Sequence, residues 1–245
     1  MELANISRIS SEKYKRKAWF RGVKAILRIF VKKPEFIYLG EKVSPGGIIL
    51  SNHEGPKSPL SLELYGDVPA RFWGAHEMND NLISAYRYQT KIYYHQKQHW
   101  NLHLARLFCL VATPLTYMYY KGVNLISSYG DIRLRSTLTE SLNTLIEGHS
   151  VVIFPEKSDN GYLKELTGFY PGAALFFQYC QKNGINVPVH IAYLQRETRH
   201  YIFDAPTTVD ELLALGLSKK ELMQRLCDRC NELGRMSFSK DGKTL

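Results

Sequence analysis

Short apolar runs that stop at polar, proline-containing turns set the pattern of this chain. Residues 43–50 predict a buried strand, because their last three positions are apolar and the glycine and prolines of residues 55–59 prevent its continuation. Comparable runs predict further strands at residues 36–39, 71–75, 151–154, 187–192 and 201–203. The spacing of leucines over residues 132–146 predicts a helix. This order of strands and helices predicts an α/β fold, a single domain with a mostly parallel central sheet flanked by helices.

The N-terminal segment combines an apolar helical stripe with an excess of positive charge. Residues 11–33 contain nine Lys and Arg residues and one Glu, which is most of the net charge of +9 of the 245-residue chain. The predicted helical stripe consists of Trp19, Val23, Ile26, Leu27 and Phe30. We therefore expect a basic amphipathic arm at residues 1–34, before the α/β domain at 35–236. Two interpretations are open: residues 13–33 contact an anionic membrane surface, or the helix packs on the core with its lysines in solvent.

Residues 79–106 form a segment of distinct composition, for which a lid or a specificity element is one interpretation. The segment is rich in tyrosine and histidine, and a single helix would align His95, His99 and His103 on one stripe. Because a helix rises about 1.5 Å per residue, the outer two histidines would be too far apart to bind one ion. We expect a polar helix face and no metal site.

Two further apolar segments carry expectations about the core. Residues 107–120, which Pro114 divides, predict a buried helix end that leads into a strand at Gly122. Near the C terminus, a helical stripe that includes Cys230 predicts a tail helix with this cysteine in the core, followed by a frayed tail at 237–245.

One histidine lies where an α/β protein collects reactive groups. His53 comes directly after Asn52 and the apolar run of residues 48–50, so it should lie at the mouth of the sheet, where such proteins bind ligands. Its side chain changes charge near neutral pH, which suits a general base. The alternative is a histidine that only caps the turn by hydrogen bonding.

Four motifs follow one another in a distinctive order. They are strand-Asn-His at residues 48–53, strand-Phe-Pro-Glu at 151–156, Phe-x-Pro-Gly-Ala at 169–173 opening a helix, and a Val-Pro-Val strand from residue 187. Over residues 45–206 this order resembles the glycerolipid acyltransferases of the lysophosphatidate acyltransferase type. The interval between the first two motifs is longer than is usual in that family, so the resemblance implies that residues 79–106 are an insertion. The resemblance implies transfer of a fatty acyl group from acyl-CoA or acyl carrier protein to a hydroxyl of a lysophospholipid or lipid-like acceptor. His53 would take the proton from that hydroxyl, without a metal or another cofactor.

The chain departs from the family pattern at functional positions. Ser58 stands where the first motif has aspartate, so Glu156 or Asp159 would have to compensate from the second turn. Lys157 replaces the glycine after Phe-Pro-Glu, and the arginine that usually ends the second motif is absent. Lys57 and Lys157 would supply cations for a phosphate or carboxylate instead. Solvated loop lysines are the alternative.

The resemblance thus implies a catalytic set of His53, Ser58 and Glu156. The expected substrate-binding positions are Asn52, Lys57, Phe154, Pro155, Lys157, Ser158 and Gly172. Because serine brings no charge to steady the histidine, a catalytically inactive lipid- or acyl-CoA-binding descendant of the same fold is the alternative function.

Composition and the length of the apolar runs indicate where the protein works and which partners it binds. Four scattered cysteines are too few for a disulfide scaffold, which favours a reducing compartment. No signal peptide is visible, and no apolar run reaches the roughly 20 residues of a membrane crossing. We expect a cytoplasmic protein, peripheral on the inner face of the membrane. No nucleic-acid partner is expected, because the excess charge lies in one amphipathic helix and no nucleic-acid-binding module is recognisable.

Overall fold

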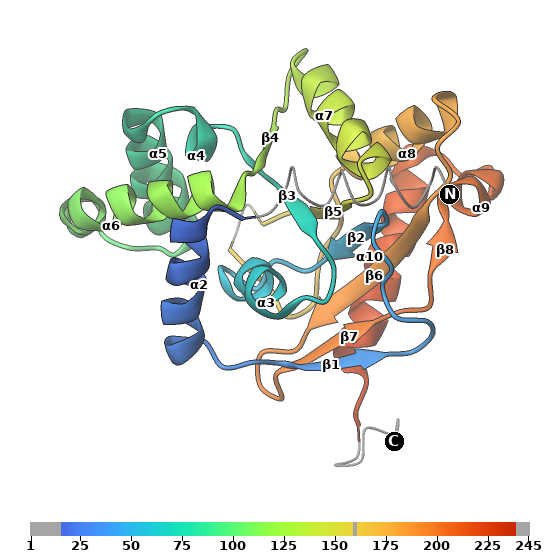
Figure 1. Cartoon of the computed structure of the whole chain (residues 1–245), viewed down its shortest axis with the longest axis horizontal. Helices are drawn as coiled ribbons and strands as arrows, with labels where there is room; N and C mark the ends of the chain where they lie inside the picture. Colours follow the sequence, from blue (N-terminus) through green and yellow to red (C-terminus); the bar gives the residue numbers. More distant parts are fainter. Residues whose placement is uncertain (1–15, 159–160, 239–245) are drawn as a thin grey trace.

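A mostly parallel sheet forms the centre of the protein in the computed structural model, which describes residues 16–158 and 161–238 (Figure 1). Its strands are β1 (Glu35–Tyr38), β2 (Ile48–Ser51), β3 (Ala70–Ala75), β4 (Ile126–Ser128), β5 (Ser150–Ile153), β6 (Pro188–Leu194), β7 (His200–Phe203) and β8 (Thr207–Thr208). They follow the order β1-β7-β6-β2-β5-β3-β4, and β8 pairs with β6. The predicted α/β fold is confirmed.

The middle of this sheet is built from parallel neighbours. β2 lies between β5 and β6 and runs parallel to both, and β3 continues the parallel arrangement on β5 and β4. β6 pairs antiparallel with β7 and β8. The strand predicted over residues 43–50 begins only at Ile48, because Gly46, with a φ of 87°, keeps the preceding residues in a turn.

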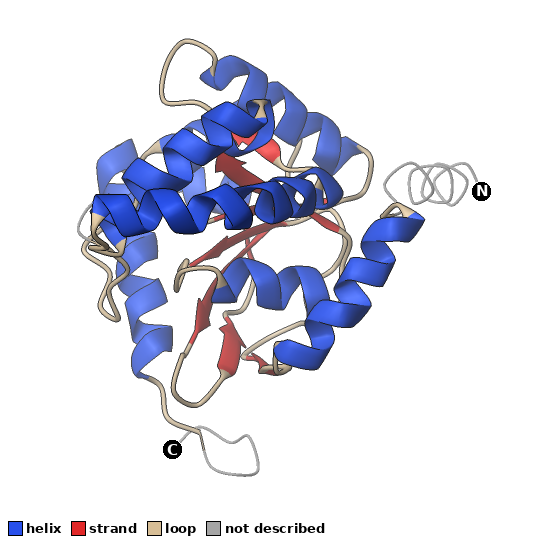
Figure 2. Ribbon diagram, turned by 90° about the vertical axis from the view of Figure 1, so that its left-hand side faces the viewer, coloured by secondary structure: helices blue, strands red, loops and turns tan. Residues whose placement is uncertain are grey.

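Helices cover both faces of the sheet (Figures 1 and 2). They are α2 (Ala18–Phe30), α3 (Lys57–Tyr65), α4 (Glu77–Asp80), α5 (Leu82–Tyr88), the π-helix η1 (Gln89–Lys97), α6 (Leu102–Val123), α7 (Leu134–Ile146), α8 (Gly172–Lys182), α9 (Val209–Ala214) and α10 (Lys219–Arg235). Alternate residues of β2 enter opposite clusters: Ile48 and Leu50 pack with residues of α8 and α10, and Ile49 packs with residues of α2 and α3. All four residues of β2 are buried, as expected for a strand covered on both faces.

The predicted N-terminal helix is present as α2, but its apolar residues do not form one buried face. Residues 11–15 lie outside the described part of the chain. Phe20 is buried, whereas Trp19, Ile26 and Phe30 are exposed. Lys24 does not point into solvent as expected; it pairs with the buried carboxylate of Glu63 at 2.9 Å. The helix thus packs through one narrow stripe and leaves a second apolar stripe outside.

The segment predicted as a buried helix end is an exposed part of a long helix. Residues 107–120 lie within α6, and Pro114 is accommodated inside it. Leu107, Val111 and Leu115 are 67%, 72% and 61% exposed. The strand expected at Gly122 begins at Ile126 instead, because α6 runs to Val123 and Asn124 ends it in the left-handed conformation.

The histidines of the predicted insertion do not share a helix. His95 belongs to η1, His99 has a φ of 57° in the connecting turn, and His103 belongs to α6. Within residues 16–158 and 161–238, no group of three or more His, Cys, Asp or Glu side chains could hold a metal ion.

The remaining expectations concern the cysteines, the C terminus and membrane spans. Cys230 is fully buried in α10, as predicted, and all four cysteines are free. Phe238, in the tail predicted to fray, packs against His200 at a ring distance of 5.7 Å; residues 239–245 lie outside the description. Among the helices described, none has both the length and the apolar character needed to cross a membrane.

Candidate functional site

The turns after β2 and β5 meet at the carboxyl edge of the sheet. Leu50 of β2 pairs with Ile153 of β5 in parallel register. His53 and Glu156 each lie three residues beyond this pair, so they come to the same height above the end of the sheet. The backbone N–H of His53 donates a hydrogen bond to Oε2 of Glu156 at 2.9 Å. The structure thus brings together two of the predicted catalytic residues.

Asn52 fixes the end of β2 to the end of β6. Its side chain is buried, its Oδ1 accepts a hydrogen bond from the backbone N–H of Leu194 at 2.7 Å, and its Nδ2 donates to the Leu194 carbonyl at 3.1 Å. The amide that was predicted to bind substrate is therefore occupied by the protein backbone. In this structure Asn52 positions His53.

A left-handed turn orients the His53 imidazole. Glu54 and Gly55 have φ values of 42° and 61°, and this turn brings the Gly55 carbonyl oxygen against Nδ1 of His53. Because a carbonyl only accepts hydrogen bonds, Nδ1 carries the proton and Nε2 keeps its lone pair. Nε2 makes no hydrogen bond with any described residue.

The surroundings of His53 favour its neutral form. The ring stacks on Tyr162 at 4.9 Å and lies 5.0 Å from the ring of Phe154. Burial lowers the pKa of His53 to about 4; the positive charge of Lys97 lowers it as well, and the hydrogen bond with Gly55 opposes both effects. At neutral pH the site therefore presents an uncharged imidazole with Nε2 available as a proton acceptor.

Glu156 supports the turn and does not contact the imidazole nitrogens. Its side chain is buried, and its Oε1 has no hydrogen-bond partner among the described residues. Burial raises the pKa of Glu156, and hydrogen bonding with the backbone amides of His53 and Leu163 lowers it. The expected compensation for the missing aspartate is therefore not made by this carboxylate.

Ser58 does not replace the aspartate either. It is fully buried in the first turn of α3, and its Oγ has no hydrogen-bond partner within the described part of the chain. Nδ1 of His53, the atom that a carboxylate would contact, is taken by the Gly55 carbonyl. The second candidate for compensation, Asp159, lies outside the described residues.

Lys97 is a site residue that the sequence did not indicate. Its Nζ donates a hydrogen bond to Oγ of Ser158 at 2.7 Å and lies 5.6 Å from the centre of the Tyr162 ring. Tyr162 in turn stacks on His53, so the lysine reaches the site from the far end of η1. π-helices often occur at functional sites, but a lysine in a tyrosine-rich segment has no sequence signature that marks it.

The other predicted positions divide into two groups. Phe154 and Ser158 take part in the site through His53 and Lys97, and the carbonyl of the buried Pro155 accepts a hydrogen bond from the N–H of Tyr170 at 2.7 Å. No contact within the described residues joins the second group to His53. Its members are the exposed Lys57 at the start of α3, the exposed Lys157 beside Gly168, and Gly172 beside the Trp73 ring.

The arrangement suits removal of a proton next to a developing negative charge. A neutral imidazole with an open Nε2 is a general base, and an ammonium group close to it can stabilise an anion. Comparison with known proteins does not assign the chain to a family: no protein-family model matches it, and no curated protein matches it at a significant level.

Proposed function

We propose that this protein is an acyltransferase of the glycerolipid type. It moves a fatty acyl group from the thioester of acyl-CoA or acyl carrier protein to a hydroxyl of a lysophospholipid or lipid-like acceptor. The observation that carries the proposal is the neutral His53, held by Gly55 at the carboxyl edge of the sheet with Nε2 uncommitted. The order of motifs around that edge is the second support.

His53 is the general base in this reaction. Nε2 takes the proton of the acceptor hydroxyl as its oxygen attacks the thioester carbonyl. The new ester bond forms and the carbon–sulfur bond breaks, and the imidazolium returns its proton to the leaving thiolate. That return is favourable, because the pKa of His53, at about 4, lies well below the value of about 8.5 for an ordinary thiol.

Lys97 is the cation of the site. Its ammonium group hydrogen-bonds Ser158 and lies over the Tyr162 ring. From there its positive charge would stabilise a phosphate of the acceptor or the oxyanion of the tetrahedral intermediate. Its position fits the role that the sequence assigned to Lys57 and Lys157. The reaction would take place at the cytoplasmic face of an anionic membrane, which the basic residues 13–33 would contact.

A non-catalytic lipid- or acyl-CoA-binding protein is the competing function. One observation favours it: no side-chain carboxylate hydrogen-bonds the imidazole nitrogens of His53 in the described structure, so the imidazolium formed in the reaction lacks a directly bonded counter-charge. A protein with this competing function would bind the thioester but would not catalyse its transfer.

Thiol release tests the proposal. Purified protein is mixed with long-chain acyl-CoA or acyl carrier protein donors and a panel of lysophospholipids, and wild type is compared with His53→Ala. His103→Ala, a change at an exposed histidine of α6, is the matched control. We expect acceptor-dependent release that His53→Ala abolishes and His103→Ala leaves intact. Donor binding without release in any combination would establish the binding protein instead.

A further inference from the structure

The outward side of α6 is a continuous apolar stripe. Its residues follow the three- and four-residue spacing of one helical face, and each is large and exposed: Leu104, Leu107, Phe108, Val111, Leu115 and Met118. The opposite side carries the buried Ala105, Cys109 and Thr113. A surface helix of a globular protein normally shows polar residues on its outer face, so this stripe needs an apolar partner.

The helices packed against α6, namely η1, α5, α4 and α2, do not cover this stripe, because its residues remain 44–72% exposed beside them. α2 contacts α6 near its C-terminal end, where the Phe20 ring lies 5.5 Å from Tyr119 and against Gly122. It leaves its own apolar side chains outside, with Ile29 and Phe30 each 78% exposed. Figure 1 shows α2 and α6 adjoining on one side of the molecule.

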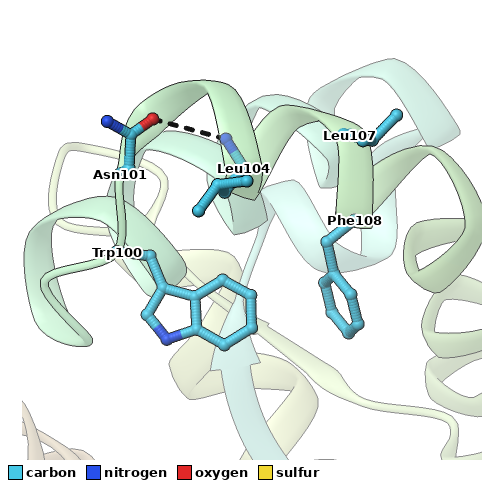
Figure 3. Close-up of a pocket in the computed structure, with 5 residues that line it drawn as sticks. All are labelled: Trp100, Asn101, Leu104, Leu107 and Phe108. Atoms are coloured by element: carbon cyan, nitrogen blue, oxygen red, sulfur yellow. Dashed lines mark hydrogen bonds between the residues drawn. The ribbon is translucent and has the colours of Figure 1, made fainter.

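A recess opens at the N-terminal end of the same stripe. It has a volume of about 630 Å³ and is lined by Trp100, Asn101, Leu104, Leu107 and Phe108 (Figure 3). The rings of Trp100 and Phe108 meet edge to face at 5.4 Å. A shallow apolar recess with an indole at its edge suits the boundary between lipid headgroups and acyl chains.

The charge around the stripe indicates which kind of apolar partner would bind it. Residues 81–123 contain no Asp or Glu, and four of their five Lys and Arg residues are exposed; the fifth, Lys97, lies in the candidate site. α2 likewise contains no acidic residue and adds Arg21 and Arg28, whereas its Lys24 is paired with Glu63. Apolar side chains flanked by positive charges are complementary to an anionic lipid layer. The acyl chains of such a layer accept the apolar groups, and its headgroups attract the basic groups.

We propose that the outward face of α6 and its Trp100 recess dock on an anionic lipid surface, with the helix axis in the plane of the headgroups. This places the apolar membrane contact on a second element, separate from residues 13–33. The proposal does not rest on acyl transfer, because binding to vesicles requires no reaction. The His53→Ala protein is expected to bind as wild type does, so failure of one proposal is distinguishable from failure of the other.

Co-sedimentation with vesicles tests whether the outward face of α6 binds lipid. The full-length protein is mixed with vesicles of phosphatidylglycerol and phosphatidylcholine in equal parts, or of phosphatidylcholine alone. Val111→Glu introduces one charge on the stripe, and Ile132→Glu introduces the same charge at a side chain that is 94% exposed before α7. We expect Val111→Glu to weaken binding to the anionic vesicles about tenfold, and Ile132→Glu to leave it near wild type. Equal effects of the two substitutions would overturn the proposal.

Fluorescence of Trp100 supplies an independent measurement. In a variant with Trp19 and Trp73 both replaced by Phe, Trp100 is the remaining tryptophan. Lipids brominated on their acyl chains should quench the exposed Trp100, and Val111→Glu should reduce the quenching. Vesicle binding without quenching would mean that another surface makes the contact. A concentration-dependent dimer in sedimentation velocity that Val111→Glu dissociates would assign the stripe to a second copy of the chain. Either result contradicts docking on lipid.

Discussion

At the scale of the residue, a backbone oxygen occupies the His53 nitrogen that a carboxylate contacts in many histidine-dependent enzymes. The Gly55 carbonyl fixes which nitrogen of His53 carries the proton, but it brings no full negative charge. A carboxylate would raise the pKa of the imidazole, whereas here burial and Lys97 lower it. In the serine-protease triad, neutralising the acid costs roughly 10⁴ in turnover. In the proposed reaction, the Gly55 contact would preserve the tautomer, and the missing negative charge would lower the rate.

The first prediction concerns the titration of His53. Its pKa in the folded protein, about 4, lies below the value of about 6.5 for an unfolded histidine. Between these values the unfolded chain binds more protons, so the free energy of unfolding should fall as the pH falls through this window. Replacing Lys97 by Met removes a positive charge and should raise the pKa of His53.

NMR titration of the imidazole measures this shift without any assay of activity. Lys91→Met, a change at an exposed lysine of the same π-helix, is the control and should leave the titration unchanged. If both lysine variants shift the His53 titration equally, a specific effect of Lys97 is excluded.

The second prediction concerns Ser58. Oγ of Ser58 is buried beside the Tyr201 hydroxyl and makes no hydrogen bond of regular geometry with the described residues. Ser58→Ala should therefore change the free energy of unfolding by less than about 1 kcal/mol. Ser58→Asp would bury a carboxylate at the same place, and it should cost more than about 2 kcal/mol. Urea unfolding of the two variants gives both values. An aspartate variant as stable as wild type, with higher acyl transfer, would show that position 58 can still serve the histidine.

At the scale of the element, the sequence predicts where strands end but not whether the apolar side chains of a helix are buried. β2 and β5 are short apolar runs stopped by proline and glycine, so their ends and the two polar turns follow from the pattern of side chains alone. The apolar residues 107–120 were predicted to be buried, yet hydropathy records only that a side chain avoids water. It does not record whether protein or another phase covers it. Lys97 depends on the path of η1, and the Gly55 oxygen belongs to the backbone, so neither has a signature in side-chain type.

The third prediction tests the turn after β2. Gly55 has a φ of 61° and Gly184 a φ of 70°, and Gly184 has no neighbour within 4 Å of an added Cβ. Alanine at either position should cost about 1 kcal/mol of unfolding free energy, because both backbones are left-handed. Gly55→Ala should also shift the carbonyl away from Nδ1 and lower acyl transfer at least about tenfold. Gly184→Ala should reduce stability alone; equal activity in the two variants would remove the turn from the mechanism.

At the scale of the whole molecule, the sheet separates two layers of different character. The helices α8 and α10 close one face with a continuous core. The other face packs against α2, α3 and the C-terminal end of α6. The outer surfaces of α2 and α6 hold most of the exposed large apolar side chains of the described residues. The N-terminal helix belongs to this second layer: Phe20 is fully buried, and Arg16 and Lys24 both pair with Glu63. It is therefore part of the folded domain as well as a basic surface.

The fourth prediction follows from that packing. A Cβ on Gly122 would lie 2.0 Å from the Phe20 ring, so Gly122→Ala must displace the side chain that holds α2 on α6. Overpacking of this kind should cost about 1–3 kcal/mol. Gly22→Ala changes a glycine of α2 with no neighbour within 4 Å of the added atom, and it should stabilise the helix by up to about 1 kcal/mol. The free energy of unfolding, measured with urea, should therefore fall for Gly122→Ala and rise for Gly22→Ala. If Gly122→Ala is as stable as wild type, α2 does not depend on Phe20 for its attachment, and the N-terminal helix is a separable arm after all.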